Sequence, residues 1–257
     1  MTLLCTHALS VSFGGVRAVD ALDLVVPPGS LVGLIGPNGA GKTTCIDAIT
    51  GFVPAAGRVV FDGHDVGSMR PHRRSALGLG RTWQSLELFD DLTVEENLQV
   101  SADTATLGGV ILDFVVPNRR RDRVSVDSAL DLLGLGDLAC RMPNELSHGQ
   151  RKLVAVARAL TARPSLICMD DPAGGLDSQE SAVLGERLRD IVATGTSILL
   201  VDHDMDLVLG VCDHVYVIDF GVVIAGGPPG EVRTDPQVIA AYLGGAVTPA
   251  GESEQFG

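Results

Sequence analysis

A glycine-rich loop that ends in lysine and threonine has the residue types and spacing of a phosphate-binding site. Gly36-Pro37-Asn38-Gly39-Ala40-Gly41-Lys42-Thr43-Thr44 spells G-x-x-x-x-G-K-T and follows the apolar run Leu31 to Ile35. Glycines let the backbone curl so that amide hydrogens point at a polyphosphate, and the positive end of a following helix points at the same place. We therefore predict that Lys42 reaches the β- and γ-phosphates of a nucleotide and that the Thr43 hydroxyl ligates Mg²⁺.

A second set of candidate residues lies where an apolar strand ends in two acids. Asp170 and Asp171 follow the apolar run Ser165 to Met169. A nucleotide site of this kind needs a carboxylate at a strand end, so Asp170 would hold Mg²⁺ directly or through water. Asp171 could orient or deprotonate the attacking water. The alternative interpretation of the pair is an acidic turn that caps a helix.

The elements that must position these residues alternate between strands and helices. The predicted helices of this part of the chain cover residues 43–50 and 178–193. The predicted strands lie around residues 9–13, 21–26, 31–35, 57–62, 165–169, 196–201, 215–219 and 222–225. Such alternation predicts a parallel sheet, with ligands at the carboxyl ends of its strands. Lys42, Asp170 and His203 all fall at those ends.

Helical patterns replace the strands between about residues 91 and 162. Thr93 and Glu96 form a capping box, residues 125–133 have apolar side chains at helical spacing, and a third helix opens near Ser147. We predict a helical subdomain at 91–162, inserted in an α/β core made of 1–90 and 163–245. Residues 246–257 are predicted to form a flexible tail.

Composition limits the partners that the chain can bind. The formal net charge of −13 disfavours attraction to nucleic acid, and no apolar stretch approaches the ~20 residues that cross a bilayer. The N-terminus has no basic-then-apolar signal segment, so we expect a cytosolic chain with reduced cysteines. His72-Arg73-Arg74 and Arg119 to Arg123 are basic clusters without interleaved aromatic rings, and we interpret each as a solvated loop or helix face.

Further motifs resemble those of the ATP-binding cassette (ABC) family. Leu146-Ser147-His148-Gly149-Gln150 resembles the LSGGQ signature, and it lies shortly before Asp170, as in that family. The remaining matches are Gln84 with the Q-loop, Gly175-Leu176-Asp177 with the D-loop, His203 with the switch histidine, and Phe13 with the aromatic residue that stacks on adenine.

The resemblance implies both a fold and a chemistry. Similar proteins have a P-loop NTPase (RecA-like) α/β core with a mostly parallel sheet, an N-terminal antiparallel β subdomain and an inserted α-helical subdomain. They bind ATP and Mg²⁺ and pair head to tail, so that signature residues such as Ser147, Gly149 and Gln150 close on ATP held by the other copy. The implied nucleotide contacts also include Phe13, Gly36, Asn38, Gly39, Gly41, Lys42, Thr43, Thr44 and Asp177. The implied metal ligands are Thr43, Gln84 and Asp170, and the implied catalytic residues are Asp171, His203, Gln84 and Lys42.

Some positions depart from the family pattern. Asp171 stands where the family usually has glutamate, and its carboxylate reaches roughly 1.5 Å less far. This difference leaves open a slow-hydrolysing, ATP-gated switch as an alternative function. His148 replaces a glycine of the signature, and Phe13 lacks the hydroxyl of tyrosine but can still stack on a base.

One branch of the family is indicated by three segments. Arg81-Thr82-Trp83-Gln84, Val201 to Met205 and Asp235 to Gly244 are similar to ATPase subunits of bacterial uptake systems for branched-chain amino acids and amides such as urea. The similarity implies a peripheral protein on the cytoplasmic side of the membrane, docked on permease subunits. It also implies a homodimer, or a heterodimer with a related ATPase subunit, and an extracytoplasmic solute-binding protein as an indirect partner.

A soluble ABC protein that acts on ribosomes or DNA is a further alternative. Such proteins generally carry two cassettes or a long coiled-coil insertion and favour basic surfaces. This chain has one cassette, no heptad run and a net charge of −13. We therefore favour the transport ATPase.

Overall fold

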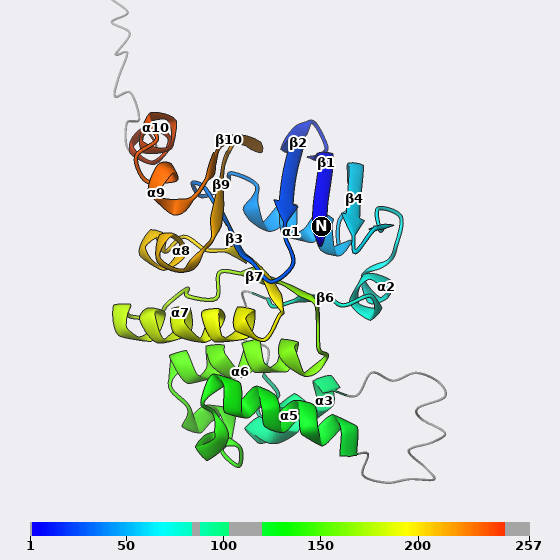
Figure 1. The fold of residues 1–257 in the computed structure, drawn as a ribbon, viewed down its shortest axis with the longest axis vertical. Helices are drawn as coiled ribbons and strands as arrows, with labels where there is room; N and C mark the ends of the chain where they lie inside the picture. Colours follow the sequence, from blue (N-terminus) through cyan, green and yellow to red (C-terminus); the bar gives the residue numbers. More distant parts are fainter. Residues whose placement is uncertain (1, 84–87, 103–119, 245–257) are drawn as a thin grey trace, which may run out of the picture.

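Two β-sheets and a group of helices make up the chain in the computed structural model (Figure 1). The structure describes residues 2–83, 88–102 and 120–244. Gln84, Arg119 and the predicted tail 246–257 lie outside the described residues. Among the described residues, no helix is both long enough and apolar enough to cross a membrane.

The first sheet is antiparallel and contains the N-terminus of the described chain. Its strand order is β2-β1-β4-β5. The strands are β1 (Leu4–Phe13), β2 (Val16–Val26), β4 (Ala56–Phe61) and β5 (His64–Asp65). All three pairings are antiparallel, and β1 and β2 form a hairpin.

The second sheet is mostly parallel, with the order β10-β9-β3-β8-β7-β6. Its strands are β3 (Leu31–Ile35), β6 (Leu79–Arg81), β7 (Leu166–Asp170), β8 (Ser197–Val201), β9 (His214–Asp219) and β10 (Val222–Gly227). Only the β9–β10 pairing is antiparallel among those described for this sheet. The two sheets confirm the predicted fold class.

The parallel sheet is covered on both faces, which explains the unbroken apolar runs of its central strands. Every residue of β3, β7 and β8 is buried. Side chains alternate between the faces of a strand. Leu31 and Ile35 accordingly pack in one hydrophobic core, whereas Val32 and Leu34 pack in the other.

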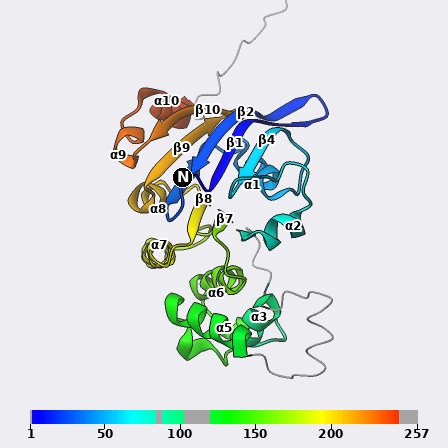
Figure 2. The same cartoon turned by 45° about the vertical axis from the view of Figure 1, so that its right-hand side comes forward.

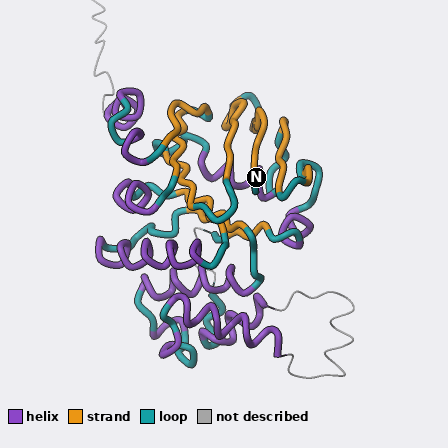
Figure 3. Tube along the Cα trace, in the orientation of Figure 1, coloured by secondary structure: helices purple, strands orange, loops and turns teal. Residues whose placement is uncertain are grey.

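Helices surround this sheet and extend from one side of it (Figure 2). They are α1 (Lys42–Thr50), α2 (Pro71–Ala76), α3 (Val94–Ala102), α5 (Arg120–Leu133), α6 (His148–Thr161), α7 (Ser178–Ala193), α8 (Met205–Val211), α9 (Pro229–Val232) and α10 (Pro236–Gly244). Two short 3₁₀ helices, η1 (Gly136–Leu138) and η2 (Pro143–Glu145), precede α6. α3, α5 and α6 pack together, and α7 lies between this group and the sheet (Figure 3). The domain boundaries themselves stay a prediction.

Several short elements were not predicted. They include α2, β6, α8 and α9, together with the two-residue strand β5. Short elements carry too few residues to show a hydrophobic period, so their positions depend on tertiary contacts.

The interpretation of His72-Arg73-Arg74 as a solvated face is wrong for Arg74, which is buried. The last carbonyls of a helix have no partner within the helix. The Arg74 guanidinium supplies one, because Nη1 donates to the carbonyls of Ala48 at 2.8 Å and Ile49 at 2.6 Å in the last turn of α1.

Candidate active site

The glycine-rich loop connects β3 to α1 and is held closely against its neighbours. Gly41 adopts a left-handed conformation with φ of 102° just before α1. A Cβ atom there would lie 2.3 Å from the Ala18 carbonyl oxygen, and one on Gly36 would lie 2.0 Å from that of Ile218. Glycine is required at both positions because backbone atoms occupy the space of a side chain.

Lys42 folds back over this loop. Its Nζ donates to the carbonyl oxygens of Gly36 at 2.7 Å and Pro37 at 2.9 Å. Burial lowers the pKa of Lys42, and the nearby carboxylates, first Asp170 and then Asp171, oppose that shift. The lysine therefore lies where it can exchange carbonyl contacts for a phosphate.

Thr43 and Asp170 are 127 residues apart in sequence but in contact in the fold. The Thr43 hydroxyl donates to Asp170 Oδ1 at 3.3 Å, because α1 begins beside the carboxyl end of β7. Burial raises the pKa of Asp170, and the hydrogen bond from Thr43 and the charge of Arg81 act against this. A hydroxyl and a carboxylate are hard oxygen ligands, so the pair fits Mg²⁺.

Arg81, at the end of β6, supports Asp170 from its other side. Nη2 lies 3.8 Å from Asp170 Oδ2, and Nη1 pairs with Asp47. The guanidinium also lies 4.0 Å from the ring centre of Trp83 and 5.3 Å from that of Phe52. In the sequence, Arg81 indicates only the branch of the family, and nothing near it shows that it faces Asp170.

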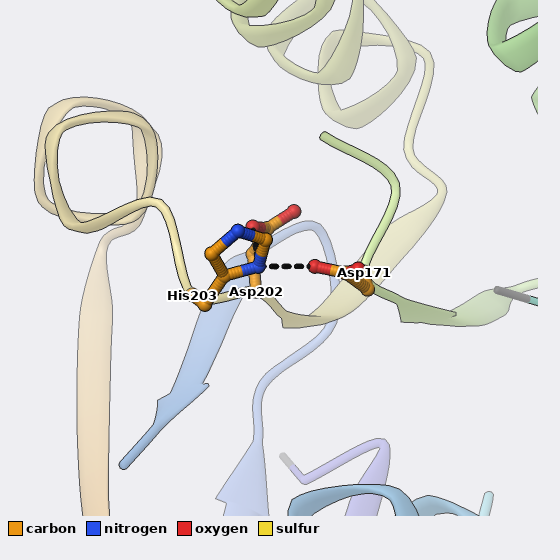
Figure 4. A group of neighbouring side chains, drawn as sticks. All are labelled: Asp171, Asp202 and His203. Atoms are coloured by element: carbon orange, nitrogen blue, oxygen red, sulfur yellow. Dashed lines mark hydrogen bonds and ion pairs between the residues drawn. The ribbon is translucent and has the colours of Figure 1, made fainter. Parts of the chain in front are cut away.

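Asp171, Asp202 and His203 form a polar group at the ends of β7 and β8 (Figure 4). His203 Nδ1 donates to Asp171 Oδ1 at 2.6 Å and lies 3.5 Å from Asp202 Oδ1. Asp171 has a positive φ of 53°, and its amide donates to the Val201 carbonyl at 2.7 Å. The structure therefore brings Asp171, the predicted base, into contact with His203, the predicted switch histidine.

Asp202 belongs to this group but was not among the site residues predicted from the sequence. Its buried carboxylate accepts from the amides of Ala173 at 2.8 Å and Asp204 at 2.9 Å. The pKa of Asp202 is raised because the effect of burial is larger than the opposing effect of these hydrogen bonds. Its position just before His203 could have marked it as the support of the loop that carries the histidine.

Ser147, Gly149 and Gln150 lie at the start of α6. Ser147 is its N-cap, with Oγ accepting from the Gln150 amide at 3.2 Å, and Gln150 Oε1 accepts in return from the Ser147 amide at 2.9 Å. Asp177 similarly caps α7 by accepting from the amides of Gln179 and Glu180.

The two helix starts line a cavity of about 210 Å³. Its described lining includes Ser147, Gly149, Gln150 and Asp177. It contains no residue of the glycine-rich loop at residues 36–44, the predicted phosphate loop. The fold thus brings Lys42, Thr43, Asp170, Asp171 and His203 to one edge of the sheet, and it gathers the signature and D-loop residues separately. Phe13, at the end of β1, is 53% exposed, and Gln84 is outside the described residues.

Comparison with known proteins decides the family. The family model described as "ABC transporter" matches residues 19–174, which is more than half of the chain. The chain belongs to the ABC transporter family. A second family model, "Branched-chain amino acid ATP-binding cassette transporter", matches residues 222–248 of the cassette, from β10 onward.

Relatives match the cassette over nearly its whole length. The high-affinity branched-chain amino acid transport ATP-binding protein LivG of Escherichia coli K12 is 36% identical over 251 residues, which cover 95% of the cassette and 98% of the relative. BraF of Pseudomonas aeruginosa, with the same description, is 35% identical over 254 residues, covering 95% and 98%.

A solved structure supports the same assignment. The ADP conformation of MJ1267, an ATP-binding cassette of an ABC transporter, has a TM-score of 0.85 and 33% identity, and the match covers 95% and 99% of the two chains. The cassette is therefore a nucleotide-binding ATPase whose hydrolysis of ATP is coupled to transport.

Proposed function

We propose that this ABC ATPase powers uptake of branched-chain amino acids, or of related amides, through membrane permeases. The observation that carries the proposal is the branch-specific match at residues 222–248, outside the 19–174 match shared with ABC transporters in general. The relatives named for branched-chain amino acid transport support it, because the cassette spans 98% of their length. The cassette would act at the cytoplasmic face of the membrane, with an extracytoplasmic solute-binding protein that delivers the solute.

The phosphate loop and the adjoining strand ends would hold magnesium-ATP. Lys42 and the loop amides, with Asn38 and Thr44 at either end, would bind the β- and γ-phosphates. Thr43 and Asp170 would hold Mg²⁺, together with Gln84. Bound magnesium would neutralise charge on the phosphates.

Hydrolysis would depend on Asp171 and His203. Asp171 would orient the attacking water or take its proton, and it is only partly buried. The His203 side chain is 63% exposed, so its ring is accessible to the γ-phosphate of a bound nucleotide. There it would stabilise the charge that develops in the transition state.

A second copy, or a related ATPase subunit, would complete the site. We propose that Ser147 and the Gly149 amide close on ATP held by the phosphate loop of the partner, with Gln150 and Asp177 positioning the two helix starts. Hydrolysis removes the γ-phosphate and those contacts, so the pair opens.

Asp171 favours one other function, a slow-hydrolysing ATP-gated switch. The carboxylate is shorter than glutamate, and a hydrogen bond of 2.6 Å holds it to His203. In such a switch, ATP binding without hydrolysis would change the state of the permeases.

Reconstitution with the partner subunits tests the proposal. The cassette, candidate permeases and solute-binding protein would be assembled in lipid vesicles, and phosphate release measured with leucine, urea or no solute. We expect release to rise with leucine in the wild type and to be lost in Lys42→Ala. A stimulation by urea alone would move the solute to the amides, and release unaffected by any solute would favour the switch.

A further inference from the structure

A carboxylate already occupies the start of the signature helix α6. Glu180 Oε1 accepts from the Gly149 amide at 3.3 Å and lies 3.5 Å from Ser147 Oγ, which can donate to it. The same residue belongs to the first turn of α7, where its Oε2 accepts from the Asp177 amide at 3.4 Å. One half-buried acid therefore bridges the starts of two helices.

The site that Glu180 occupies suits an anion. The first amides of a helix have no partner within it, and the helix dipole adds positive potential there. α6 has 14 residues, and Gly149 is its second residue, with an amide that points out of the helix start. These are the donors that the proposed function assigns to the γ-phosphate of ATP on the partner.

The absence of a side chain on Gly149 makes room for this acid. A Cβ atom on Gly149 would lie 2.7 Å from Glu180 Oε1. The cavity of about 210 Å³ is lined by Glu180 together with Ser147 and Gly149, so the residue borders open space. Its contacts of 3.3–3.5 Å are longer than a strong charge-assisted hydrogen bond, which makes them easy to exchange.

We propose that Glu180 holds the phosphate-binding donors of the signature within its own chain and must leave them when ATP on a partner copy binds there. The inference rests on the proposed head-to-tail pairing. It identifies Glu180 as the residue that sets the ATP concentration needed for that pairing. An incoming phosphate and the carboxylate repel each other if both remain at the donors. The departure of Glu180 also removes its contact with Asp177, so ATP binding changes the D-loop and the signature together.

A neutral replacement of the same shape tests the charge of Glu180. Glu180→Gln keeps an oxygen for the Asp177 amide, since glutamine also serves in capping boxes, and removes the negative charge. Glu186→Gln is the matched control, because Glu186 is an exposed carboxylate on the same helix. Both substitutions would be made in the Asp171→Asn background, in which we expect hydrolysis to be strongly slowed.

Sedimentation at rising magnesium-ATP measures the concentration at which half of each protein is dimeric. We expect this concentration to fall roughly three- to tenfold for Glu180→Gln and to stay unchanged for Glu186→Gln. The affinity of the monomer for ATP, measured by fluorescence at low protein concentration, should be equal in the Asp171→Asn parent, in Glu180→Gln and in Glu186→Gln. Glu180→Ala should also lower the concentration, with a lower thermal midpoint because α7 loses part of its cap.

Two results would overturn the inference. An unchanged or higher ATP requirement in both Glu180 variants would show that the carboxylate braces the signature instead of competing with phosphate. If every protein binds ATP and none dimerises, the proposed pairing fails, and the inference fails with it. These results differ in the control, which dimerises in the first case and stays monomeric in the second.

Discussion

His203 Nδ1 donates a hydrogen bond of 2.6 Å to Asp171 Oδ1, although the two residues are 32 positions apart in sequence. The contact forms because β7 and β8 are parallel neighbours in register, with Asp170 opposite Val201. Both strands end at the same edge of the sheet, and each is followed by one of the two residues. We therefore expect Asp171 and His203 to act as one unit, so that substitutions at the two positions are not additive.

Asp171→Asn should slow phosphate release by roughly 10²- to 10⁴-fold, because an amide cannot take a proton from water. The affinity for ATP should change little. Steady-state phosphate release at saturating magnesium-ATP measures the effect, with His203→Ala and the double variant alongside. Effects that simply multiply in the double variant would contradict the coupling of the two residues.

Asp171→Glu should raise phosphate release about ten- to a hundredfold with little change in ATP affinity, since the longer carboxylate reaches further toward the attacking water. The competing effect is crowding, because the Asp171 carboxylate already packs closely against Gly174. A Cβ atom on that glycine would lie 2.3 Å from Asp171 Oδ2. The same assay distinguishes the two, because crowding would make the rate fall. An unchanged rate would show that Asp171 is not the base.

Lys42→Ala should abolish nucleotide binding while the fold stays intact. Among the described residues, the hydrogen bonds of the Lys42 Nζ atom go to loop carbonyls. Its loss therefore removes the positive charge that would bind phosphate and breaks no ion pair of the core. Isothermal titration with ATP and a thermal unfolding curve measure the two effects. Tight ATP binding by the variant would rule out the proposed phosphate site.

Arg81→Ala should destabilise the fold by about 3–5 kcal/mol, because it leaves the carboxylates of Asp47 and Asp170 without their buried cation. Arg58→Ala is the control, since Arg58 forms an exposed ion pair with Asp65. Urea unfolding should show a large loss for the first variant and a much smaller loss for the second. Equal losses would show that the Arg81 network contributes no more than a surface pair.

Local patterns in the sequence determined the phosphate loop and the main elements. β3 has the predicted bounds because an unbroken apolar run between polar segments is buried on both sides. α7 has its predicted bounds as well, since Asp177 and Glu180 form a capping box at its start. The signature also begins a helix, for which Ser147 and Gln150 supply the cap. Each of these signals lies within a few residues of the feature that it predicts.

Only the tertiary structure decided which distant residues meet. The contact of Arg81 with Asp170 follows from the pairing of β6 with β7, and β6 is too short to show a period of its own. The contact of Glu180 with Gly149 depends on how α6 and α7 pack. A charged side chain in the sequence looks the same whether it faces solvent or a partner far along the chain. Its role is therefore set by strand order and helix packing, which bring separate segments within hydrogen-bonding distance.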